Sequence, residues 1–69
     1  MPHYNLIDLR ELREQRGWTQ QAVAERLGLK RQVYNRYELK AHRPKDNLIK
    51  EIADLFEVER AEVILYFYL

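Results

Sequence analysis

The stretch from Gln20 to Leu39 constrains the fold most, because a glycine separates two short helical patterns within it. In the first pattern, from about Gln20 to Leu27, apolar residues recur at the spacing of one buried helix face. Gly28 is expected to end this helix, since glycine adopts the left-handed conformation of many helix ends without steric cost. The second helix should run from about Lys30 to Leu39 and bury two aromatic side chains, Tyr34 and Tyr37.

The outward face of the second helix carries side chains that suit the edges of DNA bases. Arginine pairs with guanine and glutamine with adenine through two hydrogen bonds, and valine can touch a thymine methyl group. Two short helices joined by a tight turn are typical of a helix-turn-helix, whose second helix enters the DNA major groove. We therefore expect five base-contacting residues: Arg31, Gln32, Val33, Asn35 and Arg36.

Charge along the chain favours DNA as the partner. The net charge is only +1, but residues 30–45 carry six basic side chains against one acidic one, while residues 46–69 carry two against six. Such runs usually just solvate a surface, yet this one coincides with the expected reading helix and with the basic loop (residues 40–45) that follows it. We expect phosphate contacts from residues that flank that helix: Gln20, Lys30, Lys40, Arg43 and Lys45.

Segments on both sides of this stretch resemble the Cro/repressor-type (Xre-like) helix-turn-helix family. Residues 9–14 and 16–20 resemble its first helix and the entry to its second, and Pro44 with residues 52–58 resembles its fourth helix and following turn. The resemblance spans residues 6–64 and implies an all-α, compact lambda-repressor-like domain of four to five helices. It also implies a structural ion pair between Arg13 and Glu38, because family members pair such an arginine with the glutamate that ends the recognition helix.

The chain departs from the family pattern at both ends of the recognition helix. Lys30 stands where the family usually has a capping serine or threonine, and Leu39-Lys40 stands where it usually has Asn-Gly. Lysine cannot accept a hydrogen bond from the free amides of a helix start, so a stabilisation of about 1 kcal/mol is missing. The exact ends of this helix are therefore not fixed by the pattern.

Capping residues mark the other expected helices. Asn5, followed by Asp8, is expected to cap a first helix that buries Leu6, Leu9 and Leu12. This helix should end at Arg16, because Gly17 stops it. Thr19 should cap the second helix and Asp46 the fourth, and a short last helix should begin near Arg60.

The C-terminal run from Val63 to Leu69 contains seven apolar or aromatic residues in succession. One interpretation is that it completes the core. The other is that it forms an exposed interface, either helical or an extended strand, since β-branched and aromatic residues also suit strands. In that case self-association or a protein partner would use the tail residues Leu65, Tyr66, Phe67, Tyr68 and Leu69.

Composition narrows the functional classes. Sixty-nine residues predict one domain, residues 1–69, and the absence of cysteine excludes disulfides and thiolate zinc sites. His3 and His42 lack ligand-spaced partners, so neither a metal nor a cofactor is expected. No signal-like start and no membrane-length apolar run occurs, which favours a soluble cytoplasmic protein. No arrangement typical of an active site is present, so we do not expect an enzyme.

The leading function is therefore a bacterial or phage transcription regulator, either a small Cro-like protein or a compact repressor. It would bind double-stranded DNA at a palindromic operator as a homodimer, at least on DNA. The alternative is an antirepressor, antitoxin or modulator that uses the same fold and the apolar tail to bind another regulator. Side chains suited to base edges favour the first function.

Overall fold

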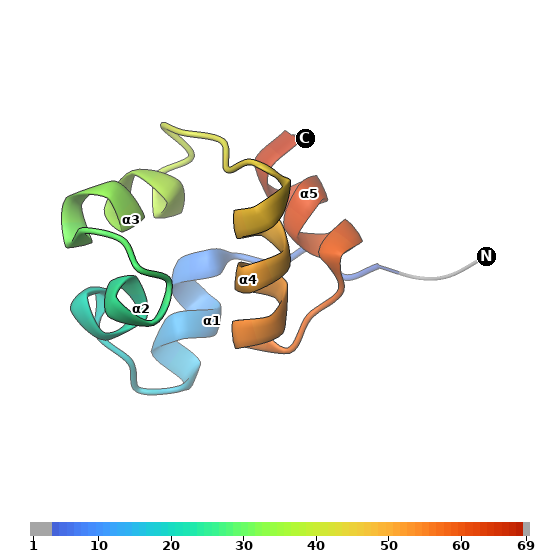
Figure 1. Cartoon of the computed structure of the whole chain (residues 1–69). Helices are drawn as coiled ribbons and strands as arrows, with labels where there is room; N and C mark the ends of the chain where they lie inside the picture. The colour runs from blue at the N-terminus through green and yellow to red at the C-terminus, as the bar shows by residue number, and fades with distance from the viewer. Residues whose placement is uncertain (1–3, 69) are drawn as a thin grey trace.

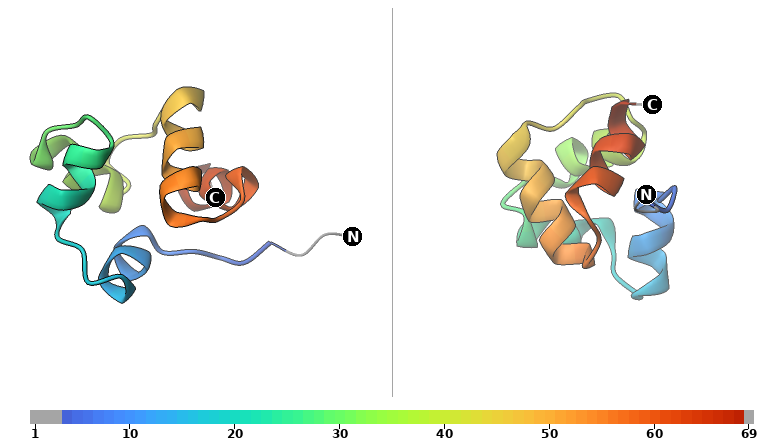
Figure 2. Two further views of the ribbon diagram at one scale, coloured as in Figure 1. Left: turned by 60° about the horizontal axis from the view of Figure 1, so that its bottom comes forward. Right: turned by 90° about the vertical axis from the view of Figure 1, so that its right-hand side faces the viewer.

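Five α-helices form the computed structural model, which describes residues 4–68. In chain order they are α1 (Leu9–Gln15), α2 (Gln20–Arg26), α3 (Arg31–Glu38), α4 (Asp46–Phe56) and α5 (Arg60–Tyr68). Helix α2 packs against α3, and α4 packs against α5 (Figure 1). The left view of Figure 2 shows that α2 and α3 lie on one side of α4, and that α5 lies on its other side. The predicted all-α fold of four to five helices is confirmed, with five helices.

Capping of α1 differs from the sequence-based expectation. Asp8, not Asn5, begins the helix, because the Asp8 carboxylate accepts hydrogen bonds from the amides of Arg10 (3.0 Å) and Glu11 (3.3 Å). The backbone N–H of Asn5 donates to Glu62 Oε2 at 2.8 Å, which holds the segment before α1 against α5. Leu6 consequently lies outside the helix and is 83% exposed, so the prediction that it packs in the core is wrong.

The starts of the other helices follow from the same principle. Thr19 Oγ1 accepts from the Ala22 amide at 3.0 Å, which confirms Thr19 as the cap of α2. The prediction that Asp46 caps α4 is wrong, because Asp46 is the first residue of the helix. The cap position belongs to Lys45, whose side chain makes no capping bond. The Asp46 carboxylate can still stabilise this helix start through the helix dipole.

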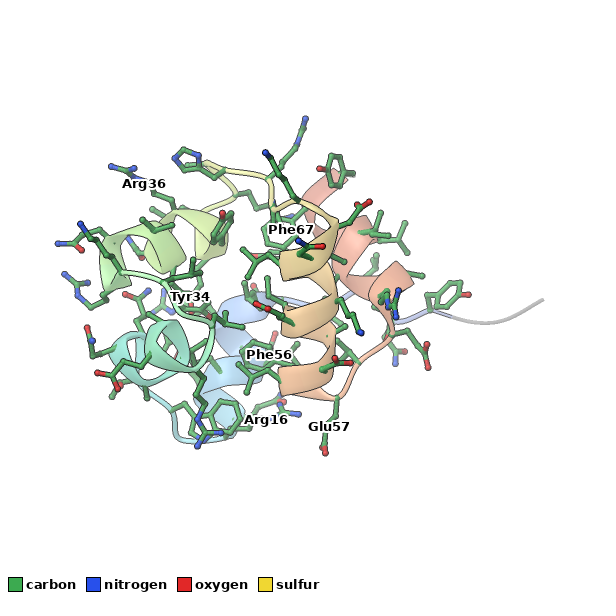
Figure 3. All side chains as sticks on the ribbon, viewed as in Figure 1. Arg16, Tyr34, Arg36, Phe56, Glu57 and Phe67 are labelled. Carbon is green, nitrogen blue, oxygen red and sulfur yellow. The ribbon has the colours of Figure 1, made fainter. Side chains whose placement is uncertain are left out.

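The core gathers residues from all five helices. Its largest fully buried side chains include Leu9, Tyr34 and Phe56, and the partly buried Trp18 packs on Phe56 with ring centroids 5.8 Å apart. Arg16 closes this end of the core: it donates to the carbonyl oxygen of Phe56 at 2.6 Å, and its guanidinium lies over both rings (Figure 3). The sequence carried no signal for this role of Arg16.

The C-terminal run is helical and belongs largely to the core. Helix α5 continues to Tyr68, so an extended strand is excluded for the described residues, and Leu69 lies outside them. Tyr66 and Phe67 are buried, which contradicts their assignment to an exposed interface. Both side chains pack against the end of α3: the Tyr66 hydroxyl donates to the Glu38 carbonyl at 2.9 Å, and the Phe67 ring packs edge-on against that of Tyr37, with centroids 6.0 Å apart.

Glu57, which follows α4, offers a test of backbone strain. Its φ of 56° is left-handed, a conformation that costs a residue with a Cβ atom but not glycine. Its negative charge also lies at the unfavourable end of the helix dipole. Glu57→Gly should therefore raise the free energy of unfolding by about 1 kcal/mol, measured by urea denaturation. Glu51→Gly, an exposed change inside α4, is the matched control and should lower it by about 1 kcal/mol; equal effects would contradict the conformational argument.

Candidate nucleic-acid interface

The turn between α2 and α3 holds the two helices in fixed relation. Gly28 adopts a φ of 69°, its amide donates to the Glu25 carbonyl, and the Leu29 amide reaches back to the Ala24 carbonyl at 2.8 Å. These bonds satisfy the last free carbonyls of α2 and reverse the chain within two residues. Ala24 is fully buried, and its small side chain allows α2 and α3 to pack closely.

Helix α3 has one buried and one exposed face. Tyr34 points into the body of the protein and is fully buried, whereas Arg36 points away from it (Figure 3). Of the five residues predicted to contact bases, Arg31, Gln32 and Arg36 are exposed, and Val33 and Asn35 are partly buried. The structure thus places long polar side chains outward on the helix that follows the turn.

The basic side chains flank this exposed face, but two of them also hold the basic loop in place. Lys40 has a left-handed φ of 59°, and its ammonium lies 4.4 Å from the centre of the Tyr66 ring. Arg43 donates through Nε to the Phe67 carbonyl at 3.2 Å and lies over the Tyr68 ring at 5.1 Å. Lys30 and Lys45 are exposed at the starts of α3 and α4, where neither side chain makes a capping bond.

Gln20 was expected to contact a phosphate, but its side-chain amide is bonded within the protein. Its Nε2 donates to Asn35 Oδ1 at 2.8 Å and to Glu38 Oε1 at 3.0 Å, which uses both hydrogens of the amide group. Both partners of Gln20 come from α3, so this role could not be predicted from the residues around Gln20. Only the backbone amide of Gln20, at the first position of α2, remains to meet a phosphate.

Arg13 and Glu38 form an ion pair that joins α1 to the end of α3. Arg13 Nε lies 2.6 Å from Glu38 Oε2, and a second nitrogen of the guanidinium donates to the Trp18 carbonyl at 2.9 Å. The two side chains are only 12% and 3% exposed. Burial raises the pKa of the Glu38 carboxyl, but hydrogen bonds from Arg13 and Gln20 outweigh it and hold the pKa below its usual value.

The Tyr34 hydroxyl lies next to this pair. Burial, reinforced by the nearby Glu38 carboxylate, raises the pKa of Tyr34 well above its usual range, so the phenol stays neutral. The hydroxyl approaches Glu38 without the geometry of a hydrogen bond, and it has no other partner among the described residues. Tyr34 therefore contributes to the core through the burial of its ring.

Glu62 is a further buried polar residue that the sequence analysis missed. Its Oε1 accepts from the Glu59 amide at 3.0 Å and so satisfies the start of α5, while Oε2 accepts from Asn5. A glutamate three residues after a helix cap is the sequence signal that identifies this role.

The described part of the chain contains no helix that could cross a membrane. Within residues 4–68, no group of three or more acidic or histidine side chains is placed to hold a metal ion.

A tight two-helix unit, an outward face of arginine and glutamine, and a basic loop beside it define a DNA-binding helix-turn-helix domain. Comparison with known families agrees: the family described as helix-turn-helix matches residues 9–63. The chain belongs to the Cro/repressor-type (Xre-like) helix-turn-helix family, whose domains bind DNA and are regulatory rather than catalytic. Neither the curated proteins nor the solved structures gave a match.

Proposed function

We propose that this protein is a sequence-specific transcriptional regulator that inserts α3 into the major groove of a palindromic operator. One observation supports this most: Arg31, Gln32 and Arg36 are exposed on a helix whose opposite face is anchored by the buried Tyr34. A rigidly held helix with long donors on its free side suits direct reading of base edges. Residues 1–69 would act as one domain in the cytoplasm.

In this proposal, base contacts come from Arg31, Gln32 and Arg36, with Val33 and Asn35 in support. Phosphate contacts come from Lys30, Lys40, Arg43 and Lys45 and from the backbone amide of Gln20. Lys40 and Arg43 would do this while they rest on the rings of α5, so that the loop meets the backbone in a fixed shape.

A palindromic operator calls for a homodimer, because one domain reads one half-site and the two recognition helices must lie about 34–36 Å apart. Helix α5 supports such a contact differently from the sequence-based expectation. Tyr66 and Phe67 are buried, but Ile64 and Tyr68 are 43% and 51% exposed, and Leu65 is partly exposed. We infer that these three residues form the symmetric contact, and light scattering with and without operator DNA tests it.

The same exposed residues support a second function, in which the protein is an antirepressor, antitoxin or modulator that binds another regulator through α5. Its acidic C-terminal third, residues 46–69, would then face a basic partner rather than DNA. Binding to duplex DNA separates the two functions.

Sequence selection from a pool of random duplexes tests the proposed function. Two variants are compared, one at a proposed base contact and one at a proposed phosphate contact. Arg36→Ala should change the selected base at one position of each half-site, at a cost of roughly 1–3 kcal/mol for the preferred sequence. Lys45→Gln, the matched control, should weaken binding to all sequences alike and reduce the salt slope by about 1. If the wild-type protein enriches no sequence, the proposed function is wrong; if Arg36→Ala selects the wild-type site, Arg36 reads no base.

A further inference from the structure

A continuous chain of hydrogen bonds runs from α1 to the DNA-facing side of α3. Arg13 donates to the Glu38 carboxylate, and Gln20 Nε2 donates both to Glu38 Oε1 and, at 2.8 Å, to Asn35 Oδ1. These groups line one shallow groove between α1, α2 and α3. Asn35 is the last member of the chain and lies on the face that also carries Arg31 and Arg36.

The ion pair between Arg13 and Glu38 fixes the orientation of the Gln20 side-chain amide. Glu38 is ionised in its pair with Arg13, so its oxygens only accept. Gln20 must therefore turn its NH2 group toward Glu38, since the reverse orientation would oppose two oxygens. The carbonyl oxygen of Gln20 then faces Arg31, whose guanidinium lies 3.5 Å away and only donates.

The second hydrogen of the Gln20 NH2 group imposes an orientation on Asn35. Because that hydrogen points at Asn35 Oδ1, the Asn35 oxygen is occupied from the protein side and its NH2 group is directed the other way. An unconstrained asparagine can present an acceptor and a donor together, which is how asparagine pairs with adenine. In this structure the oxygen faces Gln20, so the NH2 group is the part of the Asn35 side chain that is turned away from the protein.

We propose that Asn35 acts as a donor-only reader of a base carbonyl, guanine O6 or thymine O4, and that Gln20 is the residue that positions it. Adenine and cytosine carry an amino group at the corresponding place in the major groove, which would oppose the Asn35 NH2 group. This inference rests on the proposed function, because it concerns how α3 discriminates among base pairs.

Selection from random duplexes with the full chain tests this inference. At the position whose base preference changes in Asn35→Ala, the wild-type protein should favour guanine or thymine over adenine and cytosine by roughly fivefold or more. Asn35→Asp should reverse this preference, because an aspartate still accepts from Gln20 but presents an oxygen that suits the amino groups of cytosine and adenine. Its added charge should weaken binding to every sequence without removing the reversal.

Gln20→Leu tests the positioning role. It removes the bond to Asn35 Oδ1, so the asparagine can turn over and the wild-type preference at the Asn35 position should fall toward equality. Thermal melting followed by circular dichroism shows whether each variant is folded. If Gln20→Leu is unfolded, the base preference of Asn35→Asp tests the inference instead.

An unchanged preference in Asn35→Asp, or a wild-type preference for adenine or cytosine at the Asn35 position, would overturn the inference. A wild-type protein that selects no sequence at all would instead overturn the proposed function.

Discussion

Arg13→Met should lower the free energy of unfolding by about 3 kcal/mol, because it leaves the Glu38 carboxylate buried without its cation. Glu38 is almost fully shielded, and three donor groups from Arg13 and Gln20 converge on it. Domains of this size have few kcal/mol in reserve, so the variant should be partly unfolded at moderate temperature. Urea denaturation followed by circular dichroism measures the loss.

The chain offers two controls for this prediction. Arg10 and Glu14 form an ion pair of similar length, 2.7 Å, but both side chains are well exposed, so Arg10→Met should cost less than about 1 kcal/mol. The double variant Arg13→Met/Glu38→Leu removes both buried charges and should recover a large part of the stability. If the double variant is as unstable as the sum of the single ones, the uncompensated charge is not the cause.

The pH dependence of stability gives an independent check on Glu38. Because its folded pKa is lowered, the group stabilises the native state above its unfolded pKa of about 4.3, and this contribution is lost as the pH falls through the folded pKa. In Arg13→Met, burial should instead raise the pKa, so protonation at low pH relieves the buried charge. The difference in stability between the two proteins should therefore shrink as the pH falls.

Local patterns were sufficient to predict the helix-turn-helix. Gly28, the Thr19 cap and the spacing of Val23, Ala24 and Leu27 act within a few residues of one another, and the structure has α2 and α3 where these patterns place them. The residue that caps a helix could not be predicted in this way where residues distant in the sequence contact the helix start. Asn5 and Asp8 are both possible caps of α1; the structure uses Asp8, while Glu62, 57 residues after Asn5, binds the backbone N–H of Asn5.

The same distinction applies to the candidate site. The exposure of Arg31, Gln32 and Arg36 could be predicted, because the helical spacing of apolar residues in the sequence shows which face of α3 is buried. The role of Gln20 depends on where α3 places Asn35 and Glu38 relative to α2, a tertiary relation that no single segment encodes. At the C-terminus, the spacing of Val63, Tyr66 and Phe67 was that of a buried helix face, but their packing against the end of α3, far earlier in the chain, was not apparent.

Phe67→Ala should destabilise the domain by about 3–5 kcal/mol, at least as much as the loss of the Arg13 cation. Phe67 is buried, packs edge-on against Tyr37 and Tyr66 at 6.0 and 4.9 Å, and so joins α5 to the end of α3. Tyr68→Ala is the matched control, since this neighbouring ring is half exposed, and it should cost less than about 1 kcal/mol.

Comparing stability with self-association separates the two interpretations of the C-terminal run. If Phe67 belongs to the core, Phe67→Ala lowers the urea midpoint at every protein concentration, whereas Tyr68→Ala chiefly weakens any dimer seen by sedimentation. If Phe67→Ala instead leaves the monomer as stable as the wild type and abolishes only association, Phe67 is an interface residue and its burial against Tyr37 is not what holds α5 in place. The first outcome is expected because the Phe67 side chain is only 4% exposed and its ring packs against those of Tyr37 and Tyr66, contacts that alanine cannot make.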